Sequence, residues 1–141
     1  MAAFARNLFL TLFLVVLAGC STISPFNQYA YQQATALKVD ALALVDKSNE
    51  PYAQHAAEIA DIETRCRKAY EYANGLPNNQ DTANQWKIIT DPDGGSLFAY
   101  FQLWKSEGQV RPAAIKDAEQ QLAQHFDQII QLESSKIKTH P

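Results

Sequence analysis

The side chains that could bind a metal ion are few in this sequence. The 141-residue chain contains three histidines, His55, His125 and His140. His55 and Glu58 stand three residues apart, a spacing that places two ligands on one face of a helix. His125 and Asp127 do not share a helix face, and His140 lies beside the terminus. We therefore expect no metal site, and we expect the histidines to be solvated or half-buried.

Cys66 is the second group with possible chemistry. A thiolate near His55 or His125 in the fold could act as a nucleophile. Cys66 also falls between Ile62 and Ala69 on a stripe of apolar residues at spacings of three and four. A buried free cysteine at such a position behaves as a small, inert apolar residue, and this is the interpretation that we favour.

Two further features of the sequence bear on calcium binding and on catalysis. Asp91-Pro-Asp93-Gly94 begins like a calcium-binding loop, but its twelfth position is Gln102 instead of the glutamate that such loops require. A tight turn explains this segment better. The sequence contains no nucleophile elbow, no glycine-rich phosphate loop and no cysteine metal motif. We predict a protein that is not an enzyme and that uses no metal or diffusible cofactor.

Aromatic residues gather in the second half of the chain. They either close one end of the fold or form an exposed patch for a partner protein or the lipid interface, where Trp and Tyr are common. Seven of the eight positions 97–104 are apolar, which is more than one short helix usually hides. The candidate contact residues are Trp86, Phe98, Tyr100, Phe101 and Trp104.

The N-terminus has the layout of an export signal. One cation, Arg6, precedes an apolar run over 8–17, which is too short to span a bilayer comfortably as a helix. Leu17-Ala18-Gly19-Cys20 follows. This tetrad resembles the lipobox of bacterial lipoprotein precursors, and the resemblance covers about the first 20 residues only.

The resemblance implies cleavage before Cys20 and attachment of diacylglycerol to its thiol, with Leu17, Ala18 and Gly19 read by the signal peptidase. The covalent lipid on Cys20 would be the only prosthetic group. Ser21 in place of Asp implies sorting to the outer membrane of a Gram-negative cell, with the domain facing the periplasm. The alternatives are a soluble exported protein cut at an ordinary site and an uncleaved anchor.

Removal of residues 1–19 leaves 122 residues, with 11 basic and 15 acidic side chains. This mild balance provides no basic face for nucleic acid and no polybasic patch for anionic lipid. With Cys20 lipidated, Cys66 has no partner for a disulfide within the chain. The stability of the domain must therefore come from packing.

The periodicity of the mature chain predicts an all-α fold, a small antiparallel bundle of about four helices over 25–138. Residues 20–24 form a short lipidated linker, Ser24 and Pro25 begin a helix that runs to 47, and a second helix covers 51–73. Ser96 caps a short helix that Gly108 closes, and Pro112 opens the last. Residues 86–90 could be a helical turn or a short strand. The aromatics Phe26, Tyr29 and Tyr31 follow the anchor so closely that contact with lipid headgroups is expected.

These features favour a membrane-anchored, non-enzymatic lipoprotein that binds a protein partner as an accessory or assembly factor of an envelope complex. An inhibitory or exclusion lipoprotein of the immunity type is the alternative. A small-ligand or metal-binding bundle that uses His55, Glu58, Cys66 or His125 is the third and least favoured hypothesis.

Overall fold

The computed structural model describes residues 23–138 of the chain. Five α-helices and two short 3-10 turns make up this part, which contains no strand. The prediction of an all-α bundle is confirmed, and residues 86–90 are helical. The elements are α2 (Gln28–Asp46), η1 (Lys47–Asn49), α3 (Tyr52–Gly75), α4 (Gln80–Thr90), α5 (Leu97–Glu107), α6 (Pro112–Ser135) and η2 (Lys136–Lys138).

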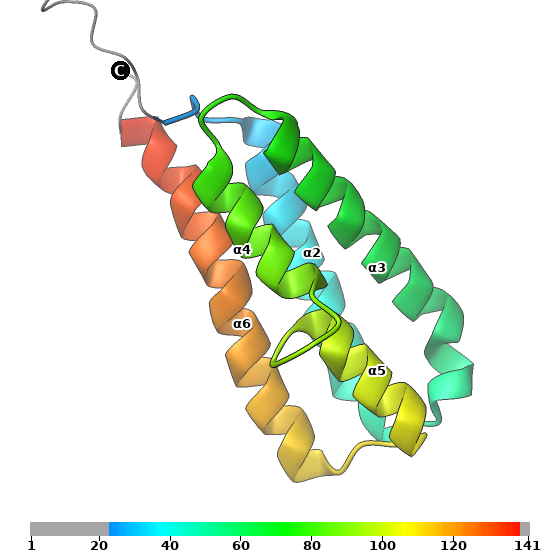
Figure 1. Cartoon of the computed structure of the whole chain (residues 1–141). Helices are drawn as coiled ribbons and strands as arrows, with labels where there is room; N and C mark the ends of the chain where they lie inside the picture. Colours follow the sequence, from blue (N-terminus) through cyan, green and yellow to red (C-terminus); the bar gives the residue numbers. More distant parts are fainter. Residues whose placement is uncertain (1–22, 139–141) are drawn as a thin grey trace, which may run out of the picture.

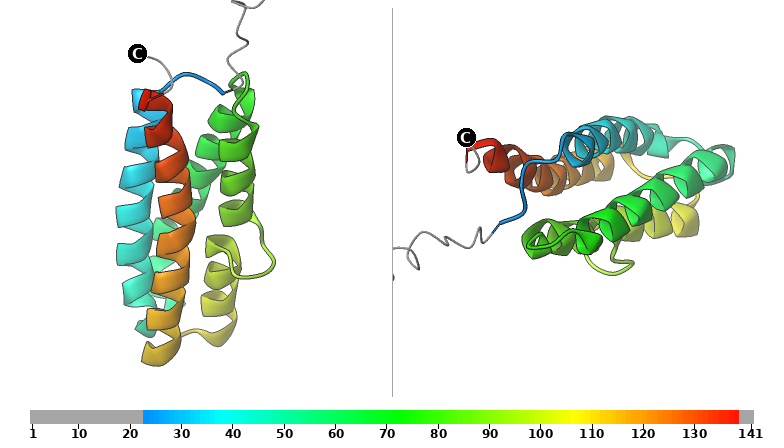
Figure 2. Two further views of the ribbon diagram at one scale, coloured as in Figure 1. Left: turned by 90° about the vertical axis from the view of Figure 1, so that its left-hand side faces the viewer. Right: turned by 90° about the horizontal axis from the view of Figure 1, so that it is seen from above.

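The helices form a four-sided antiparallel bundle in which two short helices share one side. α2, α3 and α6 run the length of the molecule, while α4 and α5 follow one another along the fourth side (Figure 1). Seen from above, α2 lies beside α6, and α3 lies beside the α4–α5 side (Figure 2). The main packing contacts join α2 to α6 and α3, and α4 to α3 and α6.

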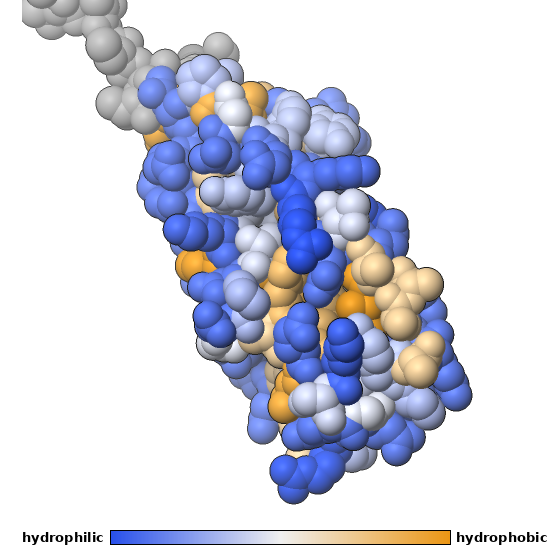
Figure 3. All heavy atoms as spheres, turned by 45° about the vertical axis from the view of Figure 1, so that its right-hand side comes forward, coloured by the Kyte–Doolittle hydropathy of each residue, from blue (hydrophilic) through white to orange (hydrophobic). Residues whose placement is uncertain are grey.

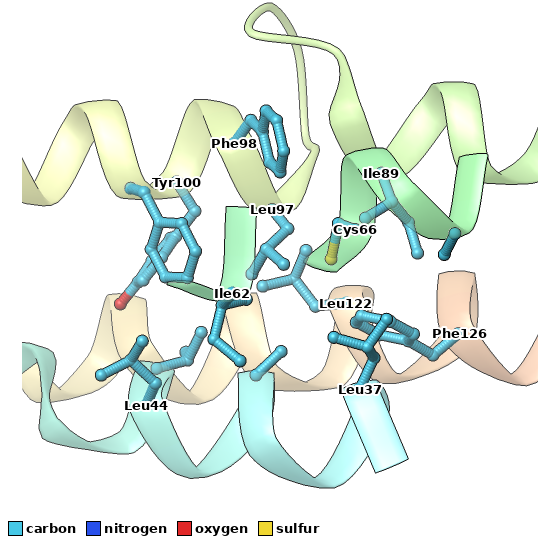
Figure 4. Close-up of a cluster of buried hydrophobic side chains, with 14 of the residues drawn as sticks. Leu37, Leu44, Ile62, Cys66, Ile89, Leu97, Phe98, Tyr100, Leu122 and Phe126 are labelled. Atoms are coloured by element: carbon cyan, nitrogen blue, oxygen red, sulfur yellow. The ribbon is translucent and has the colours of Figure 1, made fainter. Parts of the chain in front are cut away.

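The core is built from the apolar stripes of all five helices. Ile59, Ile62, Cys66, Ala69 and Ala73 of α3 are at most 5% exposed. They face side chains of α2, α5 and α6, as Figure 4 shows for Leu37, Leu97, Leu122 and Phe126. Each large apolar side chain buried in this way contributes about 1.5–3 kcal/mol to folding.

The first helix begins later than the sequence suggested. Ser24 and Pro25 were expected to open it, but α2 starts at Gln28, and Asn27 is its cap, with the Ala30 amide donating to Asn27 Oδ1 at 3.0 Å. Ser24 binds elsewhere, since its amide donates to the Asn78 carbonyl at 2.9 Å and its hydroxyl to Asn79 Oδ1 at 2.9 Å. Pairing with the distant α3–α4 connection has replaced the expected local cap.

The boundaries predicted at Ser96, Gly108 and Pro112 are confirmed, whereas α3 ends at Gly75 instead of residue 73. The Ser96 hydroxyl accepts from the Ala99 amide at 3.0 Å at the start of α5. Gly108 ends α5 at φ +76°, a backbone region that favours glycine, and Pro112 is the first residue of α6. Signals of this kind depend on local backbone geometry, which is why the sequence reveals them.

The two ends of the bundle differ in what they join. We give the name entry end to the end of the bundle that contains residue 23. This end holds the start of α2, the α3–α4 connection and the end of α6 (Figure 1). At the opposite far end, two backbone hydrogen bonds join the α2–α3 and α5–α6 connections: Tyr52 N–H to the Gly108 carbonyl at 2.8 Å, and Val110 N–H to the Ser48 carbonyl at 2.7 Å. Among the described helices, none has the length and apolar character needed to cross a bilayer.

Candidate functional site

The residues of the predicted lipobox, Leu17, Ala18, Gly19 and Cys20, and the sorting residue Ser21 lie outside the described residues. The structure begins three positions after the cysteine, at Ile23. The lipid-anchor hypothesis therefore stays a prediction.

The predicted aromatic contact patch is not on the surface. Trp86, Phe98, Tyr100, Phe101 and Trp104 are all at most 8% exposed, so the expectation that they form an exposed patch is corrected. Three neighbours cover this region. Trp104 Nε1 donates to the Glu50 carbonyl at 3.0 Å, the hydroxyls of Tyr100 and Ser48 lie 2.5 Å apart, and Arg67 lies over the Phe98 ring at 4.7 Å. The aromatic residues fill the interior of the bundle.

Cys66 has the buried position that its stripe predicted. Its side chain is fully buried, and burial raises the pKa of the thiol to about 12. A thiol with so high a pKa is not a nucleophile at neutral pH. Cys66 is a core residue.

The Asp91–Asp93 segment is the tight turn that was expected. Both aspartates are exposed, and the Asp93 amide donates to Asp91 Oδ1 at 2.9 Å. The Asp91 carbonyl accepts from the Ser96 hydroxyl. Both groups of Asp91 thus stabilise the connection before α5.

The histidines differ from one another. His125 is half-buried as predicted, and its Nδ1 has no hydrogen-bond partner among the described residues. His55 is only 7% exposed, so the expectation of a solvated or half-buried ring is wrong for it. The reason is the Trp104 ring, whose centroid lies 5.5 Å from that of His55.

His55 lies between two carboxylates at the far end. Its Nε2 is 2.7 Å from Glu50 Oε2 and its Nδ1 is 3.1 Å from Glu58 Oε1. The hydrogen bond to Glu50 raises the pKa of His55, with burial opposing and Glu58 adding to the rise. Hydrogen bonds from His55 and Lys47 lower the pKa of Glu58. A carboxylate oxygen beside each ring nitrogen favours the protonated imidazole, in which both nitrogens are donors.

The surroundings of His55 also bear on metal binding. No group of three or more His, Cys, Asp or Glu side chains that could hold a metal ion occurs within 23–138. His55 and Glu58 lie together as their spacing predicted. His55 is also paired with Glu50, and Glu58 is also paired with Lys47.

A second polar group, which was not predicted, lies inside the entry end. We call it the entry-end cluster: Ser24, Asn79, Thr82, Glu133 and Lys136. All five residues are at most 3% exposed. They come from the chain before α2, the start of α4 and the end of α6, so the cluster joins three segments that are distant in sequence.

Lys136 is at the centre of this cluster. Its Nζ donates to Glu133 Oε1 at 2.5 Å and to Asn79 Oδ1 at 2.6 Å. The Thr82 hydroxyl donates to the same Glu133 oxygen at 2.9 Å, whereas Oε2 of Glu133 is buried without a partner among the described residues. Asn79 also accepts from the Ser24 hydroxyl at 2.9 Å. Hydrogen bonds and an ion pair thus tie Ser24 to the core of the bundle.

The sequence held one signal of the entry-end cluster. The apolar stripe of α6 continues from Phe126 and Ile129 to positions 133 and 136 at spacings of four and three. Glu133 is fully buried on this stripe, whereas the neighbouring apolar residue Leu132 is only partly buried. An acidic and a basic residue at consecutive core positions of one helix indicate a buried ion pair.

A hollow of about 320 Å³ opens beside the entry-end cluster. Its lining includes Ile23, Asn79, Asp81 and Lys136. A larger, shallow groove of about 410 Å³ runs between α4 and α6 and is lined mainly by the glutamines Gln85, Gln128 and Gln131.

Searches with this chain against protein-family models, curated proteins and solved structures give no match.

Proposed function

We propose that this chain is a bacterial lipoprotein whose helical domain is held at a membrane by lipid on Cys20. The domain acts there, without a cofactor, as a protein-binding accessory or assembly factor of an envelope complex. Outer-membrane attachment with the domain in the periplasm is the location that Ser21 favours.

The observation that carries this proposal is the closeness of the lipobox to a firmly held chain. Ser24, four residues after Cys20, is 3% exposed and is bound through its amide and its hydroxyl to the α3–α4 connection. A linker this short gives a lipid on Cys20 little freedom relative to the bundle. Such an arrangement supports a domain that works at a membrane surface.

The state of the potentially reactive side chains supports a non-enzymatic role. The Cys66 thiol is fully buried with a pKa of about 12, and His55 is engaged by Glu50 and Glu58. Neither is free to take part in nucleophilic or metal chemistry.

Substitution of Cys20 tests the anchor. Cys20→Ser should abolish labelling by radioactive palmitate and release the domain from membranes, because one thioether carries the diacylglycerol. Cys66→Ala is the matched control, since it removes the other thiol and leaves lipid labelling unchanged. A Cys20→Ser protein that stays on membranes at the level of the parent chain would show that the leader is an uncleaved anchor.

A partner is tested with the lipidated protein in its own membranes. Chemical cross-linking, gentle solubilisation, affinity capture and mass spectrometry should recover envelope proteins that Cys20→Ser no longer captures. Recovery of the same proteins from both samples would argue against a partner that is met at the membrane.

A further inference from the structure

We propose that the entry end of the bundle is itself a membrane-contact surface, which rests on a phospholipid bilayer through Ile23, Tyr29 and Ile137. This inference rests on the proposed lipid anchor at Cys20. It adds a defined orientation, with the bundle axis pointing away from the membrane and the far end presented to partners.

The length of chain between Cys20 and the bundle limits how far this end can lie from lipid. Only Ser21 and Thr22 separate Cys20 from Ile23, and even fully extended the three steps from Cys20 to Ile23 span only about 10 Å. Ser24 provides no further slack because it is bound to Asn78 and Asn79. A lipid on Cys20 therefore places the entry end at the depth of the headgroups.

The exposed apolar side chains are concentrated at this end. The described part of the chain exposes six large hydrophobic residues, and three of them belong to the entry end: Ile23 (40%), Tyr29 (57%) and Ile137 (55%). They come from the chain before α2, the first turn of α2 and η2. Hydrophilic residues cover most of the face shown in Figure 3, and hydrophobic areas lie between them both at the entry end and midway along the bundle.

Aromatic residues support the same assignment. Tyr29 packs edge-on against Tyr72, with ring centroids 5.1 Å apart, and the ring centroids of Phe26 and Tyr31 are 6.2 Å apart. Tyrosines combine an apolar ring with a polar hydroxyl, and this combination is favoured at the boundary of headgroups and acyl chains.

The segments of the entry end also carry few charges. No charged residue occurs over 21–37 or over 72–80. The uncharged part of α2 alone, 28–37, is about 15 Å long. Lys136 is 3% exposed and its ammonium group is bound inside the entry-end cluster, so Asp81 at the start of α4 and Lys138 in η2 carry the other charges of these segments. Removing this end from water therefore requires little desolvation of charge.

Single labelled cysteines test the orientation. Ile23→Cys and Ile137→Cys are made in the full, lipidated chain and labelled with a polarity-sensitive maleimide fluorophore. Cys66 does not compete for the label because it is buried with a pKa of about 12. Leu103→Cys (41% exposed) matches Ile23, and Val39→Cys (67% exposed) matches Ile137; both controls lie away from the entry end.

Each labelled protein is reconstituted into vesicles of phosphatidylethanolamine and phosphatidylglycerol. Flotation with the vesicles measures the anchor, and the fluorescence measures the contact. We expect a blue shift and a rise in intensity at positions 23 and 137, with quenching by headgroup-labelled nitroxide lipid, and no change at 103 and 39.

The outcomes separate the two proposals. Proteins that float but show the same spectra at all four positions would overturn the membrane contact and leave the lipoprotein intact. Proteins that do not float would overturn both. A change at 23 and 137 in native membranes that is absent in protein-free vesicles would also overturn the inference, because it would show a protein covering this end.

Discussion

Replacement of Lys136 by methionine removes the positive charge of the entry-end cluster while keeping a long, unbranched side chain. The change deletes the contacts of Nζ with Glu133 Oε1 at 2.5 Å and with Asn79 Oδ1 at 2.6 Å. Glu133 stays fully buried, and its remaining hydrogen bond comes from the Thr82 hydroxyl. The substitution therefore leaves a buried carboxylate without its counter-charge.

Loss of one partner from a buried ion pair costs about 3–5 kcal/mol. For a domain of this size we expect the melting temperature to fall by about 10–20 °C. Thermal and urea unfolding followed by far-ultraviolet circular dichroism measure both quantities. Because Ser24 is bound to Asn79, hydrogen exchange at the Ser24 amide should also become faster.

Two further variants serve as controls for this prediction. Lys38→Met removes an exposed ion pair with Asp127, whose side chain is 57% exposed, and should cost less than about 1 kcal/mol. The double variant Glu133→Leu/Lys136→Met should be more stable than Lys136→Met alone, because it leaves no unpaired buried charge. A Lys136→Met protein as stable as Lys38→Met would refute the view that this ion pair is coupled to the fold.

Three further predictions concern the rest of the bundle. Since the hydrogen bond to Glu50 raises the pKa of His55, the stabilisation by His55 should be complete below about pH 6.5 and lost as pH rises through the raised value. The difference in melting temperature between the parent chain and His55→Gln should therefore shrink from pH 5.5 to 8.5. A constant difference would contradict the pairing of His55 with Glu50. The thiol of Cys66, with a pKa of about 12, should react with a thiol reagent only after denaturation, and rapid reaction in the folded protein would mean that it is accessible. Gly108→Ala should destabilise by about 1 kcal/mol because of its φ of +76°, whereas the control Gly75→Ala, at a helical position with open space around it, should not destabilise in the same urea titration.

The helix boundaries could be predicted because local chemistry sets them. Ser96, Gly108 and Pro112 act through their own backbone geometry and nearest neighbours. The start of α2 could not, since Ser24 binds Asn79, 55 positions later in the chain. Only the folded arrangement reveals that such a partner exists.

The burial of α5 shows the same limit. Its sequence is apolar on nearly every side, which left an exposed patch and a buried plug as alternatives. The choice depends on α5 lying in line with α4 on one side of the bundle, with Ser48 and the backbone of Glu50 against it. Positions of this kind come from tertiary packing, which no periodicity within α5 encodes.

Because the chain runs along the four sides of the bundle in alternating directions, its two described ends lie at the same end of the molecule. This arrangement has a practical consequence for work on the protein. Entry of the chain and the end of α6 both lie at the entry end (Figure 2), so an affinity tag fused after residue 141 would begin only three residues beyond η2, against the proposed bilayer. Such a tag could lift the domain off the lipid and separate it from its partner. The exposed turn at residues 91–95, between α4 and α5 on the side that these two helices share, is the better place for an epitope or a fluorescent insertion.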